Sequence, residues 1–218
     1  MSELTLIKEA VTIIERLEEA GYEAYAVGGC VRDMLLGRQP EDYDITTSAT
    51  PEEIKHIFKK TIDTGIEHGT VTVRINKKSF EVTTYRIDGE YLDGRHPDGV
   101  SFTRNINEDL LRRDFTINAM AYHPERGLLD PYGGKDDLDS KIIRCVGDPY
   151  KRFSEDSLRM LRAFRFAAQL GFAVEEGTYN AIKDLAAGIE RVSAERIAGE
   201  IIKLITSDRP ETMELLYE

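Results

Sequence analysis

The sequence lacks long hydrophobic runs and has few cysteines, and both deficits narrow the class of protein. Hydrophobic residues make up 41% of the 218 residues, yet no apolar run approaches the ~18 residues that a membrane span needs. The N-terminal segment carries acids among its apolar side chains and lacks the basic start of a signal peptide. Two distant cysteines, Cys30 and Cys145, do not indicate a disulfide framework. We therefore expect reduced thiols in a cytoplasmic protein with no membrane partner.

Positive charge is also scarce. The chain has 29 Lys+Arg against 40 Asp+Glu, which gives a net charge of −11 and argues against broad electrostatic binding of nucleic acid. The charge is unevenly sorted, because residues 151–165 contain five basic and two acidic side chains, a local excess of +3. The four histidines show no zinc-ligand spacing. Neither a phosphate-binding P-loop motif nor a nucleophile elbow is present.

The first two thirds of the chain predict an α+β arrangement. Apolar spacing predicts an initial helix ended by Gly21, and Thr50 begins a later helix with a capping box. Alternating apolar residues predict a hairpin, and a Gly- and Asp-rich stretch predicts a long loop, a feature that is usually functional or disordered. The predicted elements are helices over 3–20, 30–36, 50–60 and 106–113, strands over 22–27 and 43–47, a hairpin over 71–84, a loop over 88–101 and a turn region over 130–139.

The last third predicts helices only. These span 154–170, 175–187 and 193–206, with Ser154 and Ser193 as N-caps and Gly171 as the stop of the long helix. The chain therefore divides into an α+β part over 1–147 and a helical part over 148–218. No disordered linker joins the two parts.

Two carboxylates and two glycines form the first chemical constellation. Gly28-Gly29 lies between a predicted strand and a helix, where backbone N–H groups can approach a phosphate. Asp42 and Asp44 are two apart at the start of a strand, so both carboxylates point to the same side. Such a pair suits Mg²⁺ together with phosphate oxygens. A lone D-x-D or Gly-Gly is weak evidence and fits a solvated turn; the ordered combination is stronger.

Glu81 is a candidate third carboxylate. It lies on the second strand of the predicted hairpin, on the face opposite Phe80 and Val82. An exposed strand glutamate without a chemical role fits this position equally well.

A second constellation is the run Arg112-Arg113-Asp114-Phe115, with Asn118 three residues further on. Arginine makes bidentate bonds to phosphate, and the neighbouring carboxyl and amide groups suit a sugar. The alternative is a helix C-terminus whose arginines complement the helix dipole.

The third constellation lies on the predicted helix over 154–170. Met160, Ala163, Phe164 and Ala167 form an apolar stripe, which we interpret as core. Along the flank of this stripe, one acidic side chain and then three basic side chains follow at intervals of three residues. Local ion pairs, such as Asp156–Arg159 or Glu155–Arg159, explain any one contact. They do not explain three arginines with few opposing acids, which suit a nucleobase edge and a triphosphate. The flanking residues are Asp156, Arg159, Arg162 and Arg165.

These motifs occur in a fixed order: G-G-x-x-R-D, D-x-D, a Gly-rich loop, R-R-D-F-T-x-N-A, E-D-x-x-R and R-x-S-x-E-R. In that order they resemble the class II tRNA nucleotidyltransferase and bacterial poly(A) polymerase family, from about Tyr25 to Ile205. The resemblance implies a small mixed β-sheet with flanking helices, a nucleotidyltransferase head of the polymerase-β type over 1–147. An all-helical neck, the nucleotide-recognition domain, would follow over 148–218.

The resemblance also implies residue roles. Asp42 and Asp44 would hold catalytic Mg²⁺, with Glu81 beside them as a catalytic candidate. The triphosphate would contact Gly28, Gly29 and Arg32. The second constellation would fix the nucleotide, with Asp114 selecting ribose. Asp156 and Arg159 would read the base edge of CTP or ATP, with Arg162 and Arg165 nearby. The implied nucleotide-binding residues are Gly28, Gly29, Arg32, Arg113, Asp114, Asn118, Asp156, Arg159, Arg162 and Arg165.

The implied activity is the addition of CCA to the 3′ end of tRNA from CTP and ATP. Poly(A) polymerisation or A-addition by the same family, and a non-catalytic nucleotide- or RNA-binding module, stay open as alternatives. Family members continue into helical body and tail domains that grip tRNA. We therefore expect this chain to bind nucleotides but to hold the tRNA 3′ end weakly.

Overall fold

The computed structural model describes residues 4–89 and 99–216, and these form two compact units. The first unit comprises the described residues of Met1–Asp88, Val100–Arg112 and Asn118–Pro131. The second comprises those of Gly89–Gly99, Arg113–Ile117 and Tyr132–Glu218. This division follows backbone contacts, and the functional boundary after residue 147 stays a prediction.

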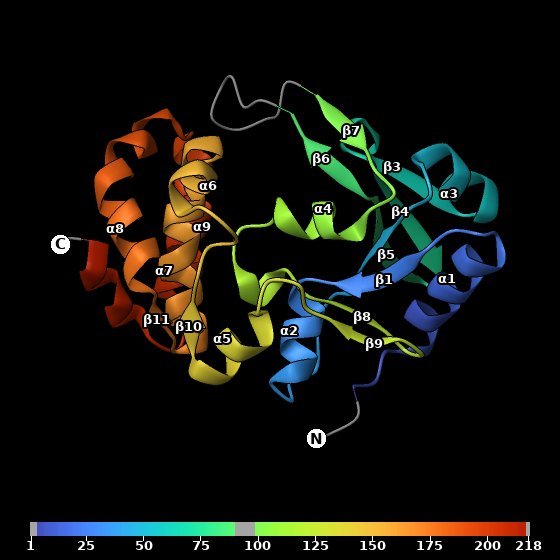
Figure 1. Ribbon diagram of the computed structural model, residues 1–218, viewed down its shortest axis with the longest axis horizontal. Coiled ribbons are helices and arrows are strands. Elements are labelled where there is room, and N and C mark those ends of the chain that lie inside the picture. The colour runs from blue at the N-terminus through green and yellow to red at the C-terminus, as the bar shows by residue number, and fades with distance from the viewer. Residues whose placement is uncertain (1–3, 90–98, 217–218) are drawn as a thin grey trace. The chain divides into compact units, whose positions relative to one another are not determined.

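A seven-stranded mixed sheet forms the centre of the first unit (Figure 1). The strand order is β3-β4-β5-β2-β1-β8-β9, in which β2 and β5 are parallel and the other neighbours antiparallel. Ile45, Val71, Val73 and Val82 are fully buried in the middle strands. The strands are β1 (Ala24–Val27), β2 (Asp44–Thr47), β3 (Thr61–Gly65), β4 (Thr70–Ile75), β5 (Lys78–Thr84), β8 (Ala121–His123) and β9 (Gly127–Leu129). The predicted α+β class with a small mixed sheet is confirmed.

Short helices cover this sheet. The first begins at Lys8, later than predicted, and Gly21 follows its end with φ 89°, as the predicted stop requires. The Thr50 capping box is present, with Thr50 and Glu53 each accepting the other's backbone N–H. The helices are α1 (Lys8–Glu19), α2 (Gly29–Leu35), α3 (Pro51–Ile57) and α4 (Ile106–Leu111), with the 3-10 turn η1 (Ile66–His68). A further 3-10 turn, η2 (Thr116–Asn118), begins in the second unit and ends in the first.

The predicted loop over 88–101 begins and ends in paired strands. β6 (Arg86–Asp88) and β7 (Val100–Phe102) form an antiparallel ribbon. Sequence reasoning missed this ribbon because each strand has only three residues. Residues 90–98 lie outside the described residues, so the rest of the loop prediction stays a prediction.

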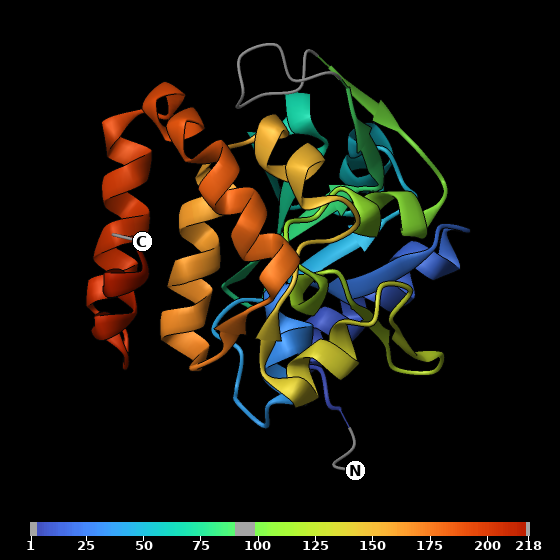
Figure 2. The same cartoon turned by 60° about the vertical axis from the view of Figure 1, so that its left-hand side comes forward.

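The second unit is mostly helical (Figure 2). Helix α7 packs against α9 and η4, and α6 packs against α8. Gly171 ends α7 in the left-handed conformation, as predicted. The elements are α5 (Gly134–Ser140), α6 (Pro149–Glu155), α7 (Leu158–Leu170), α8 (Glu176–Leu185), α9 (Ala194–Ile205), 3-10 turns η3 (Ala186–Arg191) and η4 (Pro210–Leu216), and the parallel pair β10 (Ile142–Ile143) and β11 (Ala173–Val174).

The prediction of one helix over 154–170 was wrong. Asp148 caps α6 and Pro149 begins it, so Ser154 lies inside α6 and is not an N-cap. Asp156 has extended backbone angles and interrupts the helix, and its carboxylate accepts the N–H of Leu158 at the start of α7. The interruption places a predicted site residue at a helix junction.

The turn region predicted over 130–139 contains a helix, α5. Gly133 precedes it in the left-handed conformation, and Asp136 and Asp137 lie in its first turn, where acids stabilise a helix. Sequence reasoning gave too much weight to the glycines and too little to this acidic first turn.

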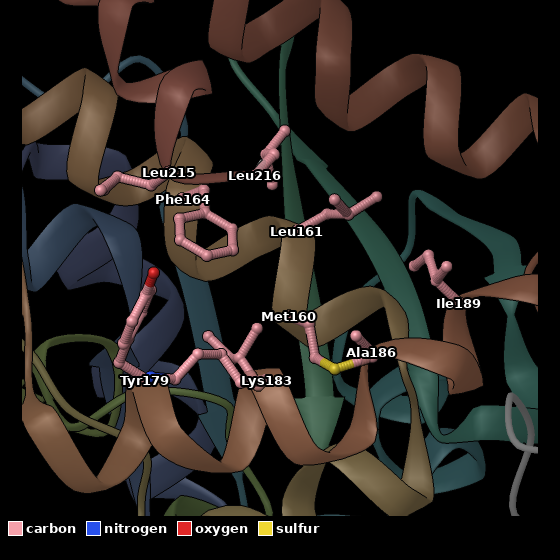
Figure 3. A pocket seen from close by; sticks show the side chains of 10 residues that line it. Met160, Leu161, Phe164, Tyr179, Lys183, Ala186, Ile189, Leu215 and Leu216 are labelled. Carbon is pink, nitrogen blue, oxygen red and sulfur yellow. The ribbon is translucent and has the colours of Figure 1, made fainter. Parts of the chain in front are cut away.

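An apolar pocket of about 310 Å³ opens among the helices of the second unit (Figure 3). Met160, Leu161 and Phe164 of α7 line one wall, and Tyr179 and Lys183 of α8 line another. Successive residues of an α-helix are 100° apart, so the wall formed by α7 lies on the side of that helix turned away from Arg159 and Arg162.

Across residues 4–89 and 99–216, no helix is long and apolar enough to cross a membrane.

Candidate active site

The glycine turn links β1 to α2 in the first unit. Gly28 has φ 78° and ψ −131°, a conformation that only glycine adopts without strain. Its N–H donates to the carbonyl of Met120 at 3.1 Å. Because this donor is engaged within the sheet, any contribution of Gly28 to phosphate binding must come from close backbone approach. Gly29 begins α2 and lies against the guanidinium of Arg32.

Arg32 is held in place by two neighbours. Its Nε and Nη2 contact Oδ1 of Asp33 at 2.9 and 2.8 Å, and its Nη1 donates to Oδ1 of Asn118 at 2.8 Å. The side chain is only 12% exposed. The structure therefore brings together two predicted residues, Arg32 and Asn118, that are far apart in the sequence, and it fixes the direction of the guanidinium.

The two aspartates lie at the same end of the sheet as the glycine turn. Asp44 is the first residue of β2 and pairs with Val27, the residue before Gly28. Asp42 precedes it by two residues, and both are exposed while Tyr43 between them is buried. Burial, and next the charge of Asp44, raise the pKa of the Cys30 thiol to about 11. Cys30 is thus a buried, protonated neighbour of the carboxylates and not a nucleophile.

Glu81 lies on β5, beside β2. Ile45 pairs with Val82 in parallel, so Asp44 and Glu81 each stand one residue before the paired positions. Glu81 is exposed, which fits both a third carboxylate and a strand glutamate without a chemical role, so its catalytic role stays a prediction. Among the described residues, no three carboxylate, imidazole or thiol side chains lie close enough together to hold a metal ion. Asp42, Asp44 and Glu81 therefore do not form a preformed cluster.

In the second unit, Asp114 is buried and paired with Arg162. Its Oδ2 accepts from Nε and Nη2 of Arg162 at 2.8 and 2.6 Å, and its Oδ1 accepts the N–H of Phe115 at 2.8 Å. Burial, and next the charge of Asp114, raise the pKa of Cys145 to about 12. The structure thus brings together two predicted nucleotide-binding residues, Asp114 and Arg162, which here form an ion pair with each other. Arg113, the residue that precedes Asp114 in the chain, is half-buried.

Asp156 pairs with Arg196 and not with Arg159. The Oδ2 of Asp156 accepts from Nη2 of Arg196 at 2.7 Å, and its Oδ1 accepts from Nη1 at 3.3 Å. Arg159 instead donates to Oε2 of Glu155 at 2.8 Å and to the carbonyl of Arg152 at 3.1 Å. The predicted Asp156–Arg159 ion pair was wrong, because the break at Asp156 turns its side chain toward α9. The Glu155–Arg159 alternative is confirmed.

Arg165 belongs to a buried ion pair. Its Nε donates to Oε2 of Glu200 on α9, its Nη1 donates to Gln169 at 2.7 Å, and its guanidinium lies 3.8 Å from the ring centroid of Phe166. Burial, and next the charge of Arg162, lower the pKa of Arg165, while Glu200 opposes this shift. Arg165 therefore joins α7 to α9, and a nucleotide-binding role for it stays a prediction.

The expectation of few acids opposing the three arginines was wrong. Glu155, Asp114 and Glu200 each pair with one of them. Asp114 and Glu200 are remote in sequence, so local spacing could not reveal them. The R-x-S-x-E-R segment contained a signal for Arg196, but a local ion pair explained that segment equally well.

Comparison with known proteins places this arrangement in a family. Residues 24–144 match the family described as the poly A polymerase head domain, and residues 171–218 match a probable RNA and SrmB binding site of polymerase A. The crystal structure of the Bacillus stearothermophilus CCA-adding enzyme in complex with CTP superposes with a TM-score of 0.89. It is 46% identical and the match covers 96% of this chain and 51% of that one.

The chain also resembles two further CCA-adding enzymes. The CCA-adding enzyme of Lactobacillus helveticus is 54% identical over 196 residues, which are 90% of this chain and 49% of that protein. The Thermotoga maritima CCA-adding enzyme complexed with tRNA_CCA has a TM-score of 0.78 at 28% identity, over 96% of this chain and 50% of that one. The chain spans about half the length of the curated relatives it matches.

The mixed sheet and the helical second unit thus each have a counterpart in the fold of about half of a CCA-adding enzyme. The head-domain match covers more than half of the chain. The chain belongs to the poly A polymerase head-domain family, which confirms the resemblance drawn from its motifs.

Proposed function

We propose that this chain carries the catalytic and nucleotide-recognising part of an enzyme that adds CCA to the 3′ end of tRNA. The observation that carries the proposal is the meeting of the carboxylate strand and the glycine turn at one end of the sheet, through the Val27–Asp44 pair. The names of relatives at 49–54% identity support the choice of substrate. A role in tRNA processing implies a cytoplasmic location.

The donor set at this end of the sheet fits Mg²⁺. Asp42 and Asp44 offer exposed carboxylate oxygens, and Mg²⁺ is usually bound through one or two carboxylates plus phosphate oxygens. Asp42 and Asp44 would hold the ion, and Glu81 would add negative charge from the next strand. When bound, the ion would polarise the α-phosphate and lower the pKa of the attacking hydroxyl.

The proposed reaction is one nucleotidyl transfer per cycle. The 3′-hydroxyl of the RNA releases its proton to water, its oxygen attacks the α-phosphorus of CTP or ATP, a new phosphodiester forms, and pyrophosphate leaves with the electrons of the broken P–O bond. Arg32 is suited to the triphosphate, since Asp33 and Asn118 fix its orientation. Gly28 and Gly29 would let the phosphates approach the backbone.

The second unit would recognise the nucleotide. Asp156 can accept a hydrogen bond from the exocyclic amine that cytosine and adenine share and that uracil and guanine lack at that edge. Arg159 would donate to the neighbouring acceptor. Asp114 would select ribose, and Arg113, Arg162 and Arg165 would contribute phosphate or base contacts.

Removal of one carboxylate tests the catalytic role. Asp42→Ala should abolish nucleotide addition and leave CTP binding in the absence of metal within about twofold, since exposed substitutions rarely disturb a fold. Asp208→Ala, an exposed aspartate in the second unit, is the matched control. Normal turnover by Asp42→Ala would refute the role.

The substrate is tested with three tRNA transcripts, which end before the first C of the tail, after one C and after two Cs. Each is incubated with Mg²⁺ and CTP, ATP, UTP or GTP over a range of RNA concentrations. A second arm joins the chain to the part of the Lactobacillus helveticus relative that the match does not cover. Two Cs followed by one A support the proposal.

The family descriptions, which name poly A polymerase, favour poly(A) synthesis as the second candidate. A long A tail in the same assay would replace our proposal with that activity. No addition in either arm would leave a non-catalytic nucleotide- or RNA-binding module.

A further inference from the structure

A basic groove lies at one edge of the sheet in the first unit. It is open, has a volume of about 450 Å³, and is lined by seven residues, of which four are cationic and none is acidic. In a chain with 29 bases and 40 acids, this composition is unusual. We call it the basic groove, and its residues are Lys59, Lys60, Thr61, Ile62, Arg74, Asn76 and Lys77.

Nearby acids do not neutralise the groove. Asp63 pairs with Lys55 at 2.8 Å, and Glu9 pairs with Lys78 at 3.2 Å. Within the described part of the chain, the four groove cations have no ion-pair partner, and all four are exposed. Their mutual repulsion works against the folded state, and a feature that costs stability points to a ligand.

The backbone fixes where these cations lie. The N–H of Arg74 donates to the carbonyl of Lys60 at 2.9 Å, so the two residues continue the β3–β4 ladder, whose strands are ~4.8 Å apart. Lys77 lies in the β4–β5 turn, where Asn76 and Lys77 have φ values of 50° and 67°. Such a turn matches the twist of a tight hairpin and holds its residues in place.

The groove is at the same end of the sheet as the proposed catalytic carboxylates. β3 begins, β4 ends, β5 begins and β2 begins at this end, and Val27 leads into the glycine turn there. From the strand spacing and the rise per residue, Arg74 and Lys60 lie roughly 12–16 Å from Asp44. An RNA strand whose 3′ end reached Asp42 and Asp44 could therefore pass along the groove.

We propose that the basic groove binds the phosphate backbone of the RNA substrate a short distance upstream of its reacting 3′ end. The inference rests on the proposed function, since RNA is the substrate there. Three of the four cations are lysines, which act as flexible point charges, and an open groove suits a line of phosphates better than one enclosed anion. Because base-specific contacts are not required, the groove suits many RNA sequences.

The test compares salt dependence of RNA binding. The variant Lys59→Gln/Lys60→Gln/Arg74→Gln/Lys77→Gln is titrated with a tRNA transcript lacking its CCA end, between 50 and 200 mM KCl. Four lost phosphate contacts should reduce the slope of log K against log salt by about 3, and the wild type should lose about 60-fold more affinity over this range than the variant. The unfolding midpoint should stay equal or rise, since repulsion is relieved.

A second variant with the same charge change separates a local effect from net charge. Lys8→Gln/Arg38→Gln/Lys151→Gln/Lys203→Gln removes four exposed cations elsewhere and should lower the slope far less. If the four-residue groove variant does not fold, Lys59→Gln/Lys60→Gln should reduce the slope by about 1.5. Equal slopes for wild type and groove variant, or an equal drop in the control, overturn the proposal. Binding of poly-glutamate without binding of RNA would also overturn the proposal.

A measurement of nucleotide binding distinguishes failure of the basic-groove proposal from failure of the proposed function. If wild type binds neither CTP nor ATP but shows the groove-dependent salt slope, the groove proposal stands and the catalytic one falls. If nucleotides bind and are added while the slope is unchanged in the groove variant, the groove proposal alone falls.

Discussion

Arg196 should control which base the chain accepts, although it is not itself proposed to touch the nucleotide. Its guanidinium holds Asp156 through bonds of 2.7 and 3.3 Å, and the N–H of Leu158 supplies one further restraint at 3.1 Å. Arg196→Met keeps the apolar stem and removes both charged bonds. Asp156 is then free to leave the orientation in which it can accept a base amine.

The magnitude follows from the contacts. A hydrogen bond between charged groups contributes about 1.5–3 kcal/mol, and the lower end applies because the two side chains are 23% and 15% exposed. A loss of about 1.4 kcal/mol corresponds to a tenfold change in affinity. We therefore expect the Kd of CTP and ATP to rise about tenfold, with the Kd of UTP and GTP nearly unchanged.

Equilibrium titration of all four nucleotides measures this selectivity in the 218-residue chain. Arg191→Met, an exposed arginine in η3, is the matched control, and Arg196→Lys should recover part of the selectivity because lysine keeps the charge but not the fork. Equal weakening of all four nucleotides would refute the reasoning, since it would indicate a general phosphate or folding effect.

Two further predictions concern the first unit. Gly28→Ala should lower the free energy of unfolding by about 1–3 kcal/mol, because φ 78° with ψ −131° excludes a Cβ, whereas Gly29→Ala should change it by less than about 1 kcal/mol; urea unfolding of both variants measures the contrast, and equal losses contradict it. The backbone N–H of Thr50 holds the pKa of Glu53 below its usual 4.5, so the stability from this carboxylate is present above that pH and lost as pH falls further. The stability difference between wild type and Glu53→Gln should therefore shrink from pH 6 to pH 3, and a constant difference would contradict the assignment.

The parts of the fold that follow local rules could be predicted from the sequence. The capping box at Thr50, the stops at Gly21 and Gly171 and the β4–β5 hairpin depend on residues within a few positions of each other. The break at Asp156 could not be predicted in this way. The apolar stripe begins only after it, at Met160, and gives no sign of the break, while one of the contacts that hold the Asp156 carboxylate comes from Arg196, 40 residues away.

The candidate site shows the same limit. The order of motifs identified Asp42, Asp44 and Gly28 as a set, and strand pairing brings them to one sheet end. The partners of the arginines depend on tertiary contact. Asp114 lies 48 residues from Arg162, and Glu200 lies 35 residues from Arg165, so sequence spacing gave no indication of either pair.

With the nucleotide contacts proposed above, the ion pair between Arg162 and Asp114 would make nucleotide binding an exchange of partners. A triphosphate that recruited Nε and Nη2 of Arg162 would separate them from Asp114, and the separated carboxylate would regain acceptor capacity that a ribose hydroxyl can use. A deoxynucleotide would separate the same pair but has no 2′-hydroxyl to donate to the buried carboxylate. Discrimination between RNA and DNA precursors would then arise as much from the resting state of the protein as from the bound one.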